Sequence, residues 1–199
     1  MKTLFIEAEK KFDINIDNLN LNTLPKKIFL AYSIQYRGLA QQIKDKLSKK
    51  IIGFRQVLGC SKLKSKHPIL LIGSGKFHAF NLAIQGNKIL FLEGNKIRKL
   101  DEKQVSKIKA KRKTALSRFY AADKIGILVS TKPGQKNLKK AQNLAKKLEK
   151  KGKEITIFLA DNINIDELEN YDIQSWVNTA CPALTFDARV VNLSELPNF

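Results

Sequence analysis

The stretch SWVNTACPALTFD, residues 175–187, contains the pattern that decides the fold of this chain. An apolar run leads to Cys181 and Pro182 follows at once, which is typical of a strand that gives way to a loop. In open α/β sheets the ligand crevice lies outside the carboxyl ends of the strands. Cys181 is therefore placed for chemistry. The alternative is a buried structural cysteine, since free cysteine is among the most buried residue types.

The other cysteine, Cys60, ends a second short run, RQVLGC at residues 55–60, and the same structural alternative applies to it. Gly59 before it lets the backbone turn sharply or pass close to a ligand. The chain has only these two cysteines. Without a short spacing between them they cannot form a disulfide framework or a self-contained zinc site, which needs paired ligands. Free thiols are typical of a reducing compartment, so the sequence predicts a cytoplasmic protein.

Continuous apolar runs alternate with amphipathic segments along the rest of the chain. Beyond residue 36, Leu39, Ile43 and Leu47 recur every four residues, which predicts one buried stripe on a helix. This alternation predicts an α/β fold with mostly parallel sheets covered on both faces. Strands are expected at residues 28–36, 51–58, 69–74, 88–94, 124–130, 154–160 and 175–181, and helices at about residues 37–50, 77–84, 100–122, 137–150 and 165–171.

The same layout occurs twice, so the sequence predicts two similar domains, each a small, mostly parallel sheet flanked by helices. Residues 27–100, with the first cysteine, form one domain, and residues 101–199, which begin with a linking helix, form the other. Residues 1–26 are expected as a strand, LFIEA at residues 4–8, and a connecting segment. That strand has no preceding partner, which suggests that earlier sequence is missing or supplied by another chain.

The sequence GSGKFH at residues 73–78 follows an apolar run and precedes a helix. It matches neither the P-loop nor the dinucleotide fingerprint, because Phe77 stands where the first needs Ser or Thr and His78 where the second needs glycine. Its backbone N–H groups can still hold an anion such as a carboxylate, and a plain tight turn is the alternative. With His67 the chain has two histidines, too few for a histidine-based metal site.

The sequence STKPGQ at residues 130–135 joins another apolar run to a helix through small, cationic and turn residues. Lys132 and the amides of this loop can bind a carboxylate or a phosphate. An ordinary connection between a strand and a helix is the alternative.

The chain is strongly basic, with 37 Lys and Arg against 18 Asp and Glu and a formal net charge of +19. This excess suggests a polyanion such as nucleic acid, or an acidic protein, as partner, and a genome-wide preference for lysine is the alternative. Hydrophobic residues make up 43% of the chain, which suffices for a packed core. No apolar run approaches the roughly 20 residues of a membrane span, and no signal peptide is evident, so no membrane partner is expected.

Five motifs in this order, AYSIQY, RQVLGC, GSGKFH, STKPGQ and WVNTACP, resemble the series carried by archaeal Dph2-type diphthamide synthases, the 2-(3-amino-3-carboxypropyl)histidine synthases. The resemblance extends from LFIEA to the C-terminus. Nearly all of the family's first domain, including its cysteine, has no counterpart, and LFIEA resembles the last strand of that domain. Arg55 and Ala183 stand where the family usually has glycine and arginine.

The resemblance implies three related α/β domains that each give one cysteine to a central 4Fe-4S cluster. The cluster binds S-adenosylmethionine, from which a 3-amino-3-carboxypropyl radical is released and added to a histidine of translation elongation factor 2, the first step of diphthamide synthesis. By the same resemblance Cys60 and Cys181 are cluster ligands. The residues implied around S-adenosylmethionine are Gly73, Ser74, Gly75, His78, Ser130, Thr131, Lys132, Pro133, Gly134 and Gln135.

Two cysteines cannot supply three ligands, and three hypotheses follow. In the first, the chain is the C-terminal part of a split synthase, active as a dimer or heteromer with a polypeptide that carries the missing domain. In the second, it is a non-catalytic companion of an intact synthase. In the third, it is a basic RNA-binding protein of translation that retains the fold. The two cysteines and STKPGQ favour the first hypothesis.

Overall fold

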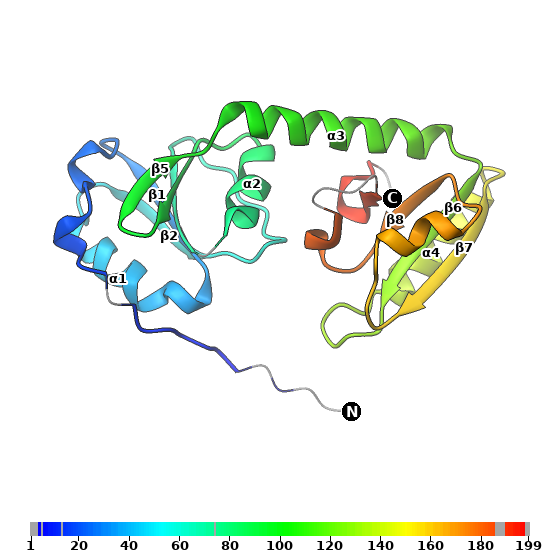
Figure 1. Ribbon diagram of the computed structural model, residues 1–199, viewed down its shortest axis with the longest axis horizontal. Helices are drawn as coiled ribbons and strands as arrows, with labels where there is room; N and C mark the ends of the chain where they lie inside the picture. Colours follow the sequence, from blue (N-terminus) through cyan, green and yellow to red (C-terminus); the bar gives the residue numbers. More distant parts are fainter. Residues whose placement is uncertain (1–3, 5, 13, 74, 186–189, 198–199) are drawn as a thin grey trace. The chain divides into compact units, whose positions relative to one another are not determined.

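The computed structural model describes residues 4, 6–12, 14–73, 75–185 and 190–197. They form two compact units, Met1–Val105 and Ser106–Phe199 (Figure 1). The boundary lies within helix α3, Glu102–Ala121, a few residues beyond the position that the sequence predicted. The first turn of this helix stays with the first unit, where Glu102 forms an ion pair with Lys99.

The first unit contains a five-stranded sheet of order β2-β1-β3-β4-β5. All pairs are parallel except β4 with β5, which form an antiparallel hairpin. The strands are β1 Ile28–Tyr32, β2 Ile51–Gln56, β3 Ile69–Ile72, β4 Ile89–Glu93 and β5 Lys96–Lys99, and the helices are α1 Arg37–Lys46 and α2 Lys76–Ile84. Short 3-10 helices occupy Ile16–Asn18, Leu21–Thr23 and Ile34–Tyr36.

The core of the first unit confirms the predicted helical stripe. Leu39, Ile43 and Leu47 are buried in one cluster with the side chains of β1 and β3. Leu21 and Leu24 belong to the same cluster. The chain before β1 therefore packs as part of this unit and is more than a connecting segment.

The strand expected at residues 4–8 is absent from the described residues. Leu4 and Ile6 have no strand partner and are 83% and 81% exposed, and Phe5 lies outside the described part. An isolated apolar run gains strand structure only from a pairing edge, and no strand among the described residues pairs with this one. Its origin as a remnant of a further domain stays a prediction.

The second unit contains a four-stranded, entirely parallel sheet of order β7-β6-β8-β9. Its strands are β6 Lys124–Ser130, β7 Glu154–Ala160, β8 Ser175–Asn178 and β9 Val190–Asn192. The helices are α3 and α4, Leu138–Glu149, with 3-10 helices at Asp166–Asn170, Pro182–Thr185 and Leu193–Glu195. One face of β6 packs on α4 through Ala141, Ala145 and Leu148 (Figure 1). The other face packs on Trp176.

Helix α3 is amphipathic, with Ile108, Ala115 and Phe119 buried and most of its lysines exposed. Val105 and Leu116 of the same helix are half-buried. None of the helices in the described ranges is long and apolar enough to cross a membrane.

Two strands were not predicted from the sequence. β5 has the sequence KIRK and is mostly exposed at the sheet edge, so it lacks an apolar run. β9 has only three residues, too few for a strand pattern to be recognised.

The two sheets repeat one topology, in which the first strand of each unit lies between the second and the third. This confirms the repeated layout that the sequence predicted. The two cysteines are not equivalent within it, because Cys60 follows the second strand of its unit and Cys181 follows the third.

Gly126 provides a test of this packing. A Cβ at this position of β6 would lie 2.3 Å from two ring carbons of Trp176. We expect Gly126→Ala to lower the free energy of unfolding by about 1–3 kcal/mol, the usual cost of overpacking a core. Urea denaturation followed by circular dichroism would measure it. Gly38 in α1 has open space around it. Gly38→Ala should instead raise stability by about 0.5–1 kcal/mol, and equal losses in both variants would contradict the packing.

Candidate functional site

The second unit brings two of the predicted motifs to one edge of its sheet. Ser130 ends β6 and Asn178 ends β8, and these strands are parallel neighbours. Since β7 lies on the other side of β6, the chain leaves β6 and β8 at the topological switch point, where open α/β sheets bind ligands. The loops that follow are STKPGQ and the one that carries Cys181.

Hydrogen bonds tie these two loops together. The Asn137 side-chain amide donates to the Thr179 carbonyl at 2.7 Å and to the Gln135 carbonyl at 3.2 Å. The Thr179 hydroxyl and amide both donate to the carbonyl of Leu128 in β6. The position of the Cys181 loop is therefore fixed relative to STKPGQ, which the sequence could not indicate because about fifty residues separate them.

The STKPGQ loop is a compact turn with exposed polar groups. The Lys132 amide donates to the Ser130 hydroxyl, and the Gln135 amide donates to the Lys132 carbonyl at 3.0 Å. Gly134 has a φ of 76°, a conformation that favours glycine. Lys132, Pro133 and Gly134 are exposed, so a ligand can reach them.

Two polar residues that the sequence reasoning missed join this loop. The Thr131 hydroxyl donates to the carboxylate of Asp161, and the Lys132 ammonium donates to the Asn162 side-chain oxygen at 2.6 Å. Both partners follow directly after β7. Their position at the carboxyl end of a predicted strand is the signal that could have identified them.

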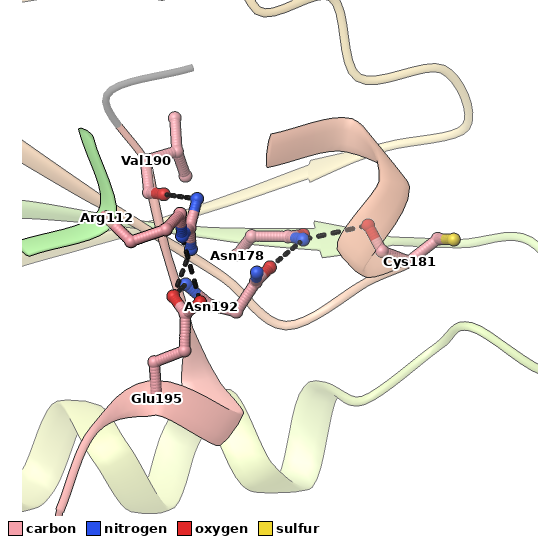
Figure 2. Close-up of polar contacts among 6 residues, drawn as sticks. All are labelled: Arg112, Asn178, Cys181, Val190, Asn192 and Glu195. Carbon is pink, nitrogen blue, oxygen red and sulfur yellow. Dashed lines mark hydrogen bonds and ion pairs between the residues drawn. The ribbon is translucent and has the colours of Figure 1, made fainter. Parts of the chain in front are cut away.

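Cys181 has a half-buried, unpaired thiol on a well-fixed backbone. Its carbonyl accepts hydrogen bonds from the Asn178 side chain at 2.9 Å and from the Leu184 amide at 3.1 Å. Figure 2 shows the sulfur pointing away from the side chains of Asn178 and Asn192. The strand itself ends at Asn178, three residues before the cysteine that the sequence placed at its end.

Cys60 lies in the first unit, in an exposed turn beyond β2. The Leu58 amide donates to the Ser61 hydroxyl at 2.8 Å, and the Ser61 amide donates back to the Leu58 carbonyl at 3.0 Å. Arg55, one of the departures from the family pattern, is an exposed residue of β2.

Helix α2 holds this turn in place. The side-chain amide of Asn81 in this helix donates to the Gly59 carbonyl at 2.5 Å. The side-chain amide of Gln85, directly after the helix, donates to the Ser61 carbonyl at 3.0 Å. The ring of Phe77 lies so close to Gly59 that a Cβ there would be 2.1 Å from it. The close approach expected at Gly59 is thus to a side chain of the protein itself.

The GSGKFH segment begins at the switch point of the first unit, between the ends of β1 and β3. The Ser33 amide donates to the Ile72 carbonyl, and a Cβ on Gly73 would lie 3.2 Å from the Ser33 hydroxyl. Within the described part of the chain this buried hydroxyl has no hydrogen-bond partner. Gly75 precedes α2 with a φ of 75°, and Ser74 lies outside the described residues.

His78 in the first turn of α2 is half-buried, and its Nδ1 has no partner among the described residues. Burial lowers the pKa of the His78 imidazole below its usual value. The side chain is therefore neutral at physiological pH and acts as a hydrogen-bonding group, not as a fixed charge.

Neither unit holds a complete metal site among the described residues, where no three His, Cys, Asp or Glu side chains converge. Each unit instead offers one free thiol at the carboxyl end of its sheet. Thiolates are the ligands that iron–sulfur clusters take, so the type of donor fits such a cluster. The two thiols of this chain are one fewer than the three cysteines that the family resemblance implies. How Cys60 and Cys181 lie relative to each other stays a prediction.

Residues 1–191 match the family model described as "Putative diphthamide synthesis protein". The chain belongs to this family. It is 31% identical over 135 residues to the 2-(3-amino-3-carboxypropyl)histidine synthase of Pyrococcus horikoshii, an alignment that covers 66% of the chain and 40% of the relative. It is 29% identical over 203 residues to the synthase of the same name from Methanocaldococcus jannaschii, with 94% and 57% covered.

The fold matches the crystal structure of Dph2 from Pyrococcus horikoshii with a 4Fe-4S cluster. The TM-score is 0.73 at 27% identity, and the match covers 86% of this chain and 56% of that one. The similarity confirms the predicted family and fold. The chain spans about half the length of the relatives it matches.

The lowered pKa of His78 predicts a pH dependence of stability. The unfolded state takes up a proton near the usual value of 6.5, while the folded state resists protonation. The free energy of unfolding should therefore be fully retained above pH 6.5 and fall as the pH drops below it. His78→Leu should flatten this part of the profile in urea denaturation, and His67→Leu is the matched control. An unchanged slope in His78→Leu would contradict the assignment.

Proposed function

We propose that this chain is the C-terminal part of a split 2-(3-amino-3-carboxypropyl)histidine synthase, a transferase of diphthamide biosynthesis. The observation that carries the proposal is the free thiol of Cys181 on a loop that hydrogen bonds of Asn137 tie to the STKPGQ loop at the switch point of the second unit. Membership of the family and the second free thiol, Cys60, support it.

The two thiolates have the role of cluster ligands in this proposal. Cys60 and Cys181 would each bind one iron of a 4Fe-4S cluster, and one iron would stay open for S-adenosylmethionine. When bound, the cluster supplies the electron that cleaves S-adenosylmethionine to release the 3-amino-3-carboxypropyl radical. The turn of residues 58–61 and the Asn178 contacts hold the two cysteines before any cluster is present.

The loops beside the cysteines have the role of substrate binding. Thr131, Lys132 and the amides around Gly134 are exposed or half-exposed polar groups that suit the carboxylate of S-adenosylmethionine. In the first unit, the segment of residues 73–78, which runs into the first turn of α2, has the same role. The neutral imidazole of His78 can donate or accept a hydrogen bond there.

The third thiolate has to come from elsewhere, because the chain contains only two cysteines. A separate polypeptide with the missing first domain is the proposed source, so the active form is a heteromer. The acceptor is a histidine of translation elongation factor 2. The net charge of +19 suits an acidic partner surface, since opposite charge speeds association.

Cysteine substitution in the reconstituted complex tests this function. The chain is mixed anaerobically with a polypeptide that carries the missing domain, iron, sulfide and a reductant. Transfer of label from carboxyl-labelled S-adenosylmethionine to elongation factor 2 should then appear, together with iron–sulfur absorbance. Cys60→Ala and Cys181→Ala should each lower transfer to background, because a cluster ligand is lost.

Two outcomes of this assay separate the hypotheses. If both cysteine variants transfer label as fast as the parent, the chain supplies no ligand and is a companion of an intact synthase. If the parent complex gains no cluster and transfers no label, the split-synthase proposal is wrong.

Lys132 tests the role of the STKPGQ loop in the same assay. Lys132→Ala should raise the concentration of S-adenosylmethionine needed for half-maximal transfer roughly tenfold, the effect of losing one hydrogen bond to a charged group. The maximal rate should change less, because the cluster ligands remain. Lys136→Ala removes an exposed lysine just beyond the loop and is the matched control. Equal behaviour of the two variants would argue against carboxylate binding by Lys132.

A further inference from the structure

A half-buried ion pair joins helix α3 to the 3-10 helix Leu193–Glu195 in the second unit. The side chain of Arg112 is only 12% exposed and pairs with both carboxylate oxygens of Glu195. Its third nitrogen, Nη1, donates to the Val190 carbonyl at 3.0 Å. The residues on either side of it in the sequence, Lys111 and Lys113, are exposed. Arg112 therefore differs from the lysines next to it in how far its side chain is buried.

The contacts continue from Glu195 to the strand that precedes Cys181. The Glu195 carboxylate accepts a hydrogen bond from the backbone N–H of Asn192 at 3.0 Å. The Asn192 side-chain oxygen accepts one from the Asn178 side chain at 2.9 Å. Asn178 and Asn192 are 2% and 8% exposed, so water does not compete for these bonds.

Asn178 carries the contacts to the cysteine loop (Figure 2). Its amide nitrogen donates to the Cys181 carbonyl as well as to Asn192, and its oxygen accepts from the Ala180 amide at 2.9 Å. The Asn178 side chain thus pairs with the N–H of Ala180 and with the carbonyl of Cys181. Such a buried amide resists rearrangement, since breaking any of its bonds leaves a buried donor and acceptor without a partner.

We propose that Arg112 and Asn178 are positioning residues for Cys181. Arg112 fixes Glu195, Glu195 fixes Asn192, and Asn192 with Asn178 fixes the backbone from which the thiol projects. The consequence for catalysis rests on the proposed function, because a cluster ligand must keep its direction when the cluster is absent. The fixed backbone itself is a property of the chain alone and is tested without cluster or substrate.

The test is the alkylation rate of each cysteine in the full-length chain without cluster. Native protein is treated with iodoacetamide, and modification of the peptides with Cys60 and Cys181 is followed by mass spectrometry. We expect Asn178→Ala and Arg112→Met to speed alkylation of Cys181 roughly fivefold or more, the change in a local opening equilibrium that one lost hydrogen bond produces. Cys60, in the other unit, should keep its rate and is the internal control.

Three further variants separate positioning from general loss of stability. Arg112→Lys keeps the charge but has one donor nitrogen in place of three, so its rate of Cys181 alkylation should lie between those of the parent and Arg112→Met. Lys113→Met removes an adjacent exposed charge and should change nothing. Ile125→Val weakens the core of the same unit at the opposite end of β6, away from the cysteine loop. It should leave the ratio of the two alkylation rates unchanged.

The proposal is overturned if Cys181 keeps its rate in Asn178→Ala, or if Ile125→Val speeds Cys181 as much as Arg112→Met at an equal loss of stability. It is also overturned if Asn178→Ala or Arg112→Met raises the alkylation rates of Cys60 and Cys181 by the same factor. If the variants change alkylation as expected but the reconstituted complex transfers no label, the positioning role stands and the proposed synthase function is wrong.

Discussion

The parallel pairing of the first strand of each unit with both the second and the third strand is the constraint on which the candidate site depends. The chain must leave the central strand toward one side and return to the other, which creates a topological switch point at the carboxyl ends. In the second unit the STKPGQ loop and the loop with Cys181 both begin at this point. Strands β6 and β8 are buried almost completely, so the polar groups that a ligand can reach lie beyond their ends.

Polar side chains at these ends have a structural task before any ligand binds. Thr179, Asn137 and Asn178 satisfy backbone groups of the loops, because buried carbonyl and amide groups are costly when unpaired. The thiol of Cys181 takes no part in these bonds in the described structure. Hydrogen bonds therefore hold the backbone of the loop, while the sulfur of Cys181 is not used in them.

The two units share a strand order and differ in where they carry their cysteine. Cys60 follows the second strand and is held by hydrogen bonds from α2, whereas Cys181 follows the third strand and is held through Asn178. In the first unit the loop after the third strand is GSGKFH, with two glycines and a neutral histidine. One topology thus presents a thiol in one unit and a glycine-rich loop in the other at the equivalent strand end.

The sequence by itself determined the class of fold, the helices, the apolar central strands and the family, because hydrophobic periodicity and continuous motifs are local signals. It also identified Cys60, Cys181 and STKPGQ as separate candidates. Only the tertiary structure decided that STKPGQ and Cys181 share one edge, and that Asp161, Asn162 and Arg112 belong with them. These contacts join residues far apart in the chain. Arg112 lies between lysines in the sequence, and no local pattern indicates that its side chain is mostly covered and pairs with a carboxylate. The short strands β5 and β9 form for the same reason, since a neighbouring strand, and not their own sequence, supplies the hydrogen bonds.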